Sequence, residues 1–269
     1  MFTILGSSGF IGSHITKYLR ELQIDYFAPM RDDPAIFNNH LGHVIYCIGL
    51  TADFRAKPFE AVQAHVCNLL NVVDKTEFDS FLYLSSTRVY NGIENTEENS
   101  TLKVNPLVFG DLYNISKLMG ESVCFASRKP LVRVVRLSNV YGNDSTSDNF
   151  IVSIIQEALL ENKVTLKTSL ESTKDYIKVD DVVKLLIQIA REGKSNIYNI
   201  ASGVNISNRT ILENIQSLTG CEIEVVPNAE TIIFSPISTR KIRNEFSFTP
   251  IDFTKSLPEL LSIKHQNRL

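Results

Sequence analysis

The sequence predicts an α/β fold: a doubly wound parallel sheet with helices on both faces, shortened on one side and completed by a small C-terminal lobe. Two observations carry this prediction. Short apolar, β-rich runs alternate with longer runs of helical periodicity, and a glycine loop lies between the first strand and the first helix. Ligands of such sheets bind at the carboxyl ends of the strands, so the functional residues are expected there.

The expected elements cover most of the chain. Strands are expected at residues 2–5, 25–30, 44–50, 81–85, 132–137 and 196–200, and helices at residues 12–22, 58–73, 111–126, 149–160 and 180–192. Beyond residue 204 the signals weaken to one helix at 209–218 and one strand at 222–226. We therefore expect a main domain of residues 1–149 and 174–203, and a small lobe of residues 150–173 and 204–269 over the sheet edge.

The link between the second and third expected strands is short. Only thirteen residues, Arg31 to His43, separate them, too few at standard lengths for the helix, strand and helix that usually stand here. We expect one βα unit to be missing, with a loop in its place, which leaves this side of the sheet open.

Composition argues against several classes of partner. The 269 residues are 43% hydrophobic and 21% charged, and a net charge of -3 without a Lys/Arg cluster disfavours nucleic acid and anionic membranes as partners. No apolar run approaches the roughly 20 residues that span a bilayer. Met1 leads straight into the first strand, which disfavours a secretory signal. The widely spaced Cys47, Cys67, Cys124 and Cys221 show no metal or disulfide spacing, which predicts a cytoplasmic protein with reduced thiols and no metal site.

The glycine loop reads GSSGFIG over residues 6–12. Gly6 would permit a sharp turn, Gly9 would let the backbone approach a pyrophosphate, and Gly12 would let the helix pack close to the strand. The helix N-terminus then presents free N–H groups to the phosphates. A structural turn in an unrelated α/β protein would show the same glycines, but the position of the loop favours a dinucleotide site. The candidate cofactor-binding residues of this loop are Gly6, Ser8, Gly9, Phe10, Ile11 and Gly12.

A tyrosine, a lysine and a serine form a candidate catalytic group. Tyr113 and Lys117 are four residues apart on an expected helix and share one face. The ammonium favours the phenolate and lowers the tyrosine pKa, so that Tyr113 can exchange a proton with a substrate hydroxyl or ketone. Ser86 follows the strand at 81–85 and places a hydroxyl at the sheet edge. An exposed i,i+4 pair and a turn-forming serine are the plain alternatives.

Seven segments spread over nearly the whole chain carry a family resemblance. They are GSSGFIG at 6–12, VIYCIGL at 44–50, YLSSTRVY at 83–90, YNISK at 113–117, RLSNVYG at 136–142, DYIKVDD at 175–181 and YNIAS at 198–202. Together they resemble the extended short-chain dehydrogenase/reductase family, which holds NAD-dependent nucleotide-sugar epimerases, dehydratases and ketoreductases. The resemblance implies a Rossmann-like fold, an NAD(P) cofactor and a nucleotide-sugar substrate.

The resemblance also implies roles for individual residues. Tyr113 is the acid/base, Lys117 orients the nicotinamide ribose, and Ser86 hydrogen-bonds the substrate oxygen. Gly49 and Leu50 line the cofactor near its ribose. Further contacts are implied for Ser85 with the cofactor and for Thr51, Thr87 and Asn139 with the substrate. In the family, helices matching residues 58–73 and 111–126 commonly form a four-helix interface, which implies a homodimer.

Two departures from the family pattern affect the expected chemistry. Met30 and Arg31 stand where an acidic residue would bind the ribose hydroxyls of NAD, and arginine suits the 2′-phosphate of NADP; a solvated surface arginine is the alternative. Family dehydratases carry an Asp-Glu pair where this chain has Thr87 and Arg88, so a sugar 4,6-dehydratase is disfavoured. His65 replaces a usual asparagine and belongs either to a proton relay or to the hydrogen-bonded interior.

The leading functional hypothesis is therefore a reductase or epimerase of a nucleotide-linked sugar, and the NADP preference favours a ketoreductase. A catalytically idle NAD(P)-binding sensor or scaffold is the alternative from another class of protein. Reduction of a non-sugar carbonyl is a third possibility.

Overall fold

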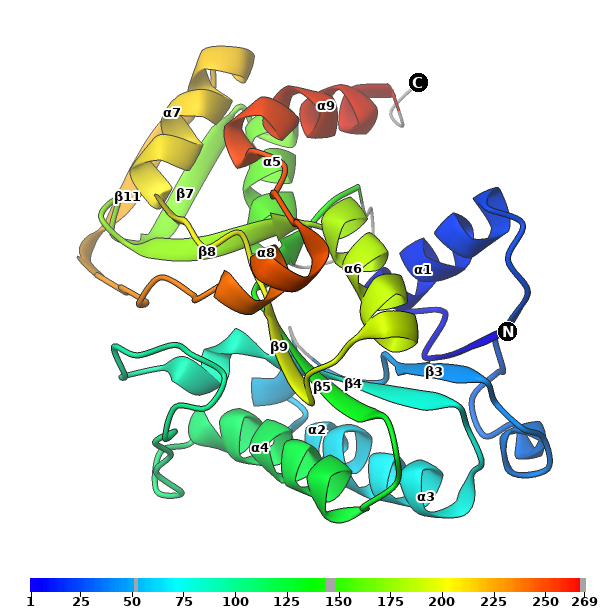
Figure 1. Ribbon diagram of the computed structural model, residues 1–269. Helices are drawn as coiled ribbons and strands as arrows, with labels where there is room; N and C mark the ends of the chain where they lie inside the picture. The colour runs from blue at the N-terminus through cyan, green and yellow to red at the C-terminus, as the bar shows by residue number, and fades with distance from the viewer. Residues whose placement is uncertain (51–52, 144–148, 267–269) are drawn as a thin grey trace.

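The computed structural model describes residues 1–50, 53–143 and 149–266 (Figure 1). Its central layer is a six-stranded sheet in the order β2-β1-β3-β4-β5-β9, and every neighbouring pair is parallel. The strands are β1 (Phe2–Leu5), β2 (Tyr26–Phe27), β3 (His43–Tyr46), β4 (Ser80–Ser86), β5 (Val132–Leu137) and β9 (Ile197–Ile200). The predicted parallel sheet is confirmed.

Helices cover both faces of this sheet. Figure 1 shows α1 (Phe10–Glu21) and α6 (Val179–Glu192) on one face, and α2 (Pro58–Val62), α3 (Asn68–Lys75) and α4 (Asp111–Ala126) on the other. Alternate strand residues feed two separate cores, because successive side chains of a strand point to opposite faces. Thus Ile45 packs in the core under α1 and α6, whereas Tyr46 packs in the core with α3 and α4. The sheet is doubly wound, as predicted.

The link between β2 and β3 confirms the missing βα unit. It contains only a 3-10 turn, η1 (Pro34–Phe37), and β3 pairs directly with β1 from Phe2 opposite His43 onward. The strand predicted at 25–30 is wrong in length, since β2 has only two residues. With no strand outside it, β2 is the sheet edge and has a single partner to pair with.

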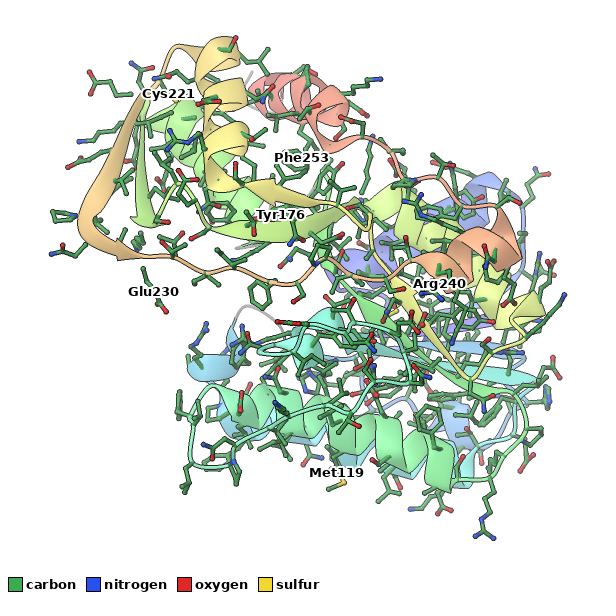
Figure 2. All side chains as sticks on the ribbon, turned by 60° about the vertical axis from the view of Figure 1, so that its left-hand side comes forward. Met119, Tyr176, Cys221, Glu230, Arg240 and Phe253 are labelled. Atoms are coloured by element: carbon green, nitrogen blue, oxygen red, sulfur yellow. The ribbon has the colours of Figure 1, made fainter. Side chains whose placement is uncertain are left out.

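The smaller lobe is richer in strands than predicted. One sheet of the lobe contains β6 (Asn139–Tyr141), β8 (Thr173–Lys178) and β10 (Asn205–Ser207), and a second contains β7 (Lys163–Thr168) and β11 (Glu222–Glu230). The helices of the lobe are α5 (Phe150–Leu160), α7 (Asn208–Thr219) and α9 (Phe253–Gln266). Its core includes Tyr176 and Phe253, whose ring centroids are 5.5 Å apart (Figure 2). A further helix, α8 (Arg240–Phe246), inserts Ile242 into the core of the main sheet. The proposed domain boundaries stay a prediction.

In the part of the chain that the structure describes, no helix is both long and apolar enough to span a bilayer.

Candidate active site

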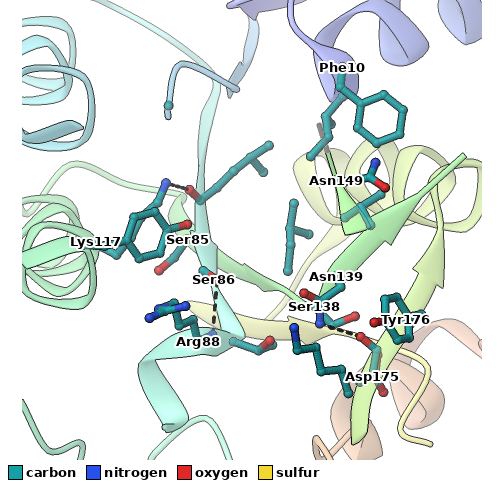
Figure 3. A pocket seen from close by; sticks show the side chains of 18 of the residues that line it. Phe10, Ser85, Ser86, Arg88, Lys117, Ser138, Asn139, Asn149, Asp175 and Tyr176 are labelled. Carbon is teal, nitrogen blue, oxygen red and sulfur yellow. Dashed lines mark hydrogen bonds between the residues drawn. The ribbon is translucent and has the colours of Figure 1, made fainter. Parts of the chain in front are cut away.

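A cavity of about 530 Å³ opens at the carboxyl edge of the main sheet, against the smaller lobe (Figure 3). Most of the predicted site residues line it: Gly9, Phe10, Ile11, Gly12, Gly49, Ser85, Ser86, Thr87, Tyr113, Lys117 and Asn139. Gly6, Ser8, Arg31 and Leu50 do not line it, and Thr51 lies outside the described residues. One cavity therefore gathers candidate residues from the glycine loop and the start of α1, the loop after β3, the strands β4 and β6, and α4.

The glycine loop forms a tight turn that leads into an uncapped helix. Gly6 has a φ of +84°, a conformation that favours glycine, and a Cβ on Gly12 would overlap the carbonyl oxygen of Gly6. The next helix, α1, begins after Gly9 without a side-chain cap and without an acidic residue in its first turn. Its N-terminal N–H groups and positive dipole end therefore suit the pyrophosphate of a dinucleotide.

Lys117 is buried beside the end of β4. Its ammonium donates to the carbonyl oxygen of Leu84 at 2.8 Å, and its nitrogen lies 6.0 Å from the centroid of the Tyr113 ring. Burial lowers the pKa of Lys117 to about 7, although the carboxylate of Glu121 acts in the opposite direction. A bound anion would stabilise the charged form of this lysine, so ligand binding and its protonation are coupled.

The other two members of the predicted trio lie in the same cavity. Tyr113 is 3% exposed, and its ring packs against Phe54 with centroids 4.6 Å apart. Ser86 ends β4 and begins the short helix η4 (Thr87–Tyr90), where its hydroxyl accepts the N–H of Arg88 at 3.2 Å. Figure 3 shows Ser86 and Lys117 reaching the cavity from two different elements. The structure thus brings together what the sequence placed 31 positions apart.

His65 lies in a single π-helical turn, η3 (Gln63–Cys67), and is fully buried. The Ser116 hydroxyl donates to the carbonyl oxygen of Tyr113, so it accepts from Nδ1 of His65 at 2.9 Å, while Nε2 accepts the N–H of Leu50 at 3.3 Å. Burial and then Lys117 lower the pKa of His65 to about 3, which keeps the ring neutral. Both ring nitrogens are engaged within the protein, as expected of a hydrogen-bonded interior histidine, and the relay stays a hypothesis.

A buried ion pair ties the site elements together. Arg136 on β5 meets Glu121 on α4 with two hydrogen bonds, of 3.0 and 2.7 Å, and the hydroxyl of Ser85 donates to the same carboxylate at 2.6 Å. Two-point pairing and a third donor compensate the carboxylate for its burial. The hydroxyl of Ser85 is thereby directed to Glu121, and its contact with the cofactor stays a prediction.

The smaller lobe supplies the opposite wall. Asn139 donates to the carbonyl oxygen of Asp175 at 2.8 Å (Figure 3), and the Asp175 carboxylate accepts the Ser202 hydroxyl at 2.8 Å. Beside it, burial and two nearby arginines lower the pKa of Lys174. The residues of this cavity that were not predicted from the sequence include Phe54, Arg55, Lys174, Tyr176, Asn205 and Phe234. Lys174 directly precedes the 175–181 segment and could have been found from it, whereas Phe234 lies in a stretch without a periodic signal.

The profile of the NAD dependent epimerase/dehydratase family matches residues 35–201, more than half of the chain. With the parallel sheet, the glycine loop and the trio at the sheet edge, this match shows that the protein belongs to that family, as the resemblance of its motifs indicated.

Curated relatives of the chain are nucleotide-sugar enzymes with differing activities. A dTDP-D-glucose 4,6-dehydratase of Dictyostelium discoideum is 24% identical over 80% of this chain and 61% of its own length, so the chain spans only about three fifths of that relative. The GDP-6-deoxy-D-mannose reductase of Pseudomonas aeruginosa is 25% identical over 83% of this chain and 81% of its own length.

Solved structures share the fold at low sequence identity. MoeE5 in complex with UDP-glucose and NAD has a TM-score of 0.87 at 20% identity and covers 100% of this chain and 99% of its own. RMD from Pseudomonas aeruginosa complexed with NADPH has a TM-score of 0.79 at 22% identity, covering 97% and 98%. The fold therefore occurs with either nicotinamide cofactor.

Proposed function

We propose that this protein is an NAD(P)-dependent enzyme that reduces or epimerises a carbon of a nucleotide-linked sugar, with Tyr113 as acid/base. The observation that carries the proposal is the meeting of Ser86, Tyr113 and Lys117 in one cavity, next to an uncapped helix N-terminus. Family membership supports the reaction class, and the named relatives support the substrate class.

The proposed roles are those that the family resemblance implies for the trio. The nicotinamide, when bound, supplies or accepts the hydride at the sugar carbon. Tyr113 exchanges a proton with the oxygen on that carbon, and the hydroxyl of Ser86 hydrogen-bonds the same oxygen. Lys117, in its charged form, favours the phenolate when Tyr113 has given up its proton.

Dehydration requires an acid at the leaving hydroxyl and a base at the neighbouring carbon. The two side chains that follow Ser86 are those of Thr87 and Arg88, and neither is a carboxylic acid. Both line the cavity beside the trio. We therefore propose reduction or epimerisation in preference to 4,6-dehydration, although a dehydratase is among the relatives.

The cofactor proposal is NADP, with NAD as the other candidate. Arg31 is exposed in the turn after β2, on the side where the βα unit is missing. A guanidinium there suits a 2′-phosphate. This side of the sheet has no further strand to cover it, so Arg31 is free to approach the adenosine end of the cofactor.

The diphosphate of the substrate is assigned to the wall formed by the smaller lobe. Lys174 and Asn139 both line the cavity there, and Lys174 forms no ion pair within residues 1–50, 53–143 and 149–266. A partly buried ammonium without an acidic partner is well placed to receive a phosphate oxygen.

The idle-module alternative is favoured only by the uncovered sheet edge. An idle module has no need of a complete trio, whereas all three side chains here line the cavity.

Two measurements separate the hypotheses. Mass spectrometry of ligands retained by the purified protein identifies the cofactor. NADPH or NADH oxidation is then followed with a panel of nucleotide-linked 4-keto sugars, and neutral and acidic nucleotide sugars are tested for epimerisation. A protein that binds cofactor but turns over none of these would support the idle module, and turnover of simple ketones alone would support the non-sugar reductase.

A further inference from the structure

Two arginines face the cavity beside the trio. They are Arg55, at the end of η2 (Asp53–Arg55), and Arg88 in η4. Neither has an ion-pair partner in the part of the chain that the structure describes. The Nε atom of Arg88 is buried and has no hydrogen-bond acceptor. A buried donor without an acceptor is unfavourable, so Arg88 is better suited to a state with an anion bound, and the exposed Arg55 lies beside it.

The ring of Phe54 contacts both guanidinium groups and also packs on Tyr113. Their central carbons lie 4.7 Å (Arg55) and 5.2 Å (Arg88) from the centroid of Phe54. Phe54 in turn packs on Tyr113, with centroids 4.6 Å apart. Arg88 is also tied to the trio through its backbone N–H, which donates to Ser86 at 3.2 Å. The two positive charges are therefore one ring away from the proposed acid/base.

The charges around this pair are mostly of the same sign. Burial and then Arg55 lower the pKa of Arg88, and burial, Arg88 and Arg55 lower that of Lys174. The acid that acts on Arg88 is Asp111, but its carboxylate already accepts the N–H of Asn105 at 2.8 Å. Arg55, Arg88 and Lys174 thus place three positive charges on two walls of the cavity. A diphosphate bound at the wall of the smaller lobe would use only the charge on that wall, which leaves the two arginines for a second anion.

We propose that Arg55 and Arg88 bind a carboxylate on the sugar, so that the substrate is a nucleotide-linked acidic sugar. This inference rests on the proposed function. The planar fork of arginine matches a carboxylate with two parallel hydrogen bonds. Lys174 and Asn139 remain for the diphosphate, and the arginine pair takes the second anion next to the reacting carbon.

The test compares acidic and neutral sugars on the same nucleotide. Isothermal titration of the protein saturated with NADP⁺ uses UDP-glucuronic acid against UDP-glucose and GDP-mannuronic acid against GDP-mannose. For the nucleotide that binds, the wild type should prefer the acidic sugar by at least about tenfold. Arg88→Gln should remove most of that preference and change the affinity for the neutral sugar by less than about threefold. Arg55→Gln should act in the same direction, and Arg88→Lys should fall between wild type and Arg88→Gln.

Two further variants locate the diphosphate and control for charge. Lys174→Gln should weaken acidic and neutral sugars alike, because it acts on the group they share. Arg209→Gln, an exposed residue of α7 paired with Glu171, should change neither. Thermal melts establish that each variant is folded.

The outcomes separate this inference from the function on which it rests. Equal affinity of the wild type for acidic and neutral sugars would overturn the inference alone. Equal loss of both in Arg88→Gln and Arg55→Gln would assign the arginines to the diphosphate and also overturn it. Failure of every nucleotide sugar to bind would overturn the proposed function together with the inference.

Discussion

The ammonium of Lys117 donates to the main-chain carbonyl of Leu84 at 2.8 Å. Leu84 lies two residues before Ser86 on β4, and Lys117 lies one turn after Tyr113 on α4. This single hydrogen bond therefore links the strand that ends in the serine to the helix that carries the tyrosine. The elements that carry the three predicted residues are therefore linked to each other by a hydrogen bond within the protein.

The first prediction tests the acid/base. Tyr113→Phe removes only a hydroxyl, so fold and cofactor affinity should persist while turnover on a confirmed substrate falls by on the order of a hundredfold or more. Ser86→Ala removes one hydrogen bond to the substrate oxygen and should cost less. Steady-state kinetics, with melting curves as control, measure both. Full turnover by Tyr113→Phe would refute the mechanism.

The second prediction concerns the buried charge of Lys117. Because its folded-state pKa is lowered from 10.5 to about 7, the unfolded chain binds more protons between these values. Burial of Lys117 therefore costs stability in this window, and the cost falls as pH rises. The free energy of unfolding of the wild type, minus that of Lys117→Met, should therefore increase from pH 7 to pH 10. The upper bound of this increase is about 1.4 kcal/mol for each unit by which the pKa of Lys117 is lowered. Parallel pH profiles in urea denaturation would contradict this.

Lys117→Met should also change catalysis. Loss of the positive charge near Tyr113 disfavours the phenolate, so the optimum pH of turnover should move upward. Cofactor affinity should fall as well, because the lysine is expected to hold the nicotinamide ribose. An unchanged optimum would separate Lys117 from the acid/base step.

The third prediction separates the two roles of glycine in the phosphate loop. A Cβ on Gly12 overlaps the carbonyl oxygen of Gly6, so Gly12→Ala should destabilise the protein by on the order of 1–3 kcal/mol. A Cβ on Gly9 makes only ordinary contact with that oxygen, at 3.4 Å, and Gly9 lines the cavity. Gly9→Ala should therefore fold normally and lose cofactor affinity. Normal cofactor binding by Gly9→Ala would place the pyrophosphate elsewhere.

The fourth prediction concerns cofactor choice. NADPH should bind more tightly than NADH, by roughly tenfold, if Arg31 contacts the 2′-phosphate. Arg31→Ala should remove the difference, whereas Arg20→Ala, at an exposed position on α1, should not. Fluorescence titration with both cofactors measures the preference. Equal affinities in the wild type would show that Arg31 is a solvated surface residue.

The fifth prediction concerns assembly. Large apolar side chains are exposed along α2, α3 and α4, among them Phe59 (85%), Leu70 and Met119 (51%), and Met119 projects from α4 away from the sheet (Figure 2). Such a row is typical of an interface. We expect a homodimer at micromolar concentration by light scattering, which Met119→Glu dissociates and Leu160→Glu on α5 does not. A monomeric wild type would refute it.

Local pattern was enough for much of the fold. The helix at 111–126 and the strand at 132–137 have the bounds of α4 and β5, because their periodicity is uninterrupted and they lie in the core. The missing βα unit followed from the short link after the second strand, compared with the elements that this fold usually has there. The trio followed from an i,i+4 spacing, the end of a strand and the family resemblance of the segments that contain them.

Other elements depend on partners far along the chain. The helix expected at 58–73 is interrupted by the π turn η3, where the hydroxyls of Tyr46 and Tyr83 donate to the carbonyls of Ala64 and His65 at 2.7 and 3.3 Å. The lobe strands β6, β8 and β10 are three to six residues long and pair with one another across distant parts of the chain. No local periodicity reports such pairings.

By itself, the sequence determined the parallel sheet and the glycine loop, because each depends on spacing within short segments. It identified the three candidate catalytic residues from such spacing together with the family resemblance of seven segments. Only the tertiary structure decided what surrounds them. The burial that lowers the pKa of Lys117, the engagement of both nitrogens of His65, and the meeting of Arg55 with Arg88 over Phe54 all arise from segments distant in the chain. Burial and electrostatic interaction depend on distance in space, which spacing along the chain does not specify.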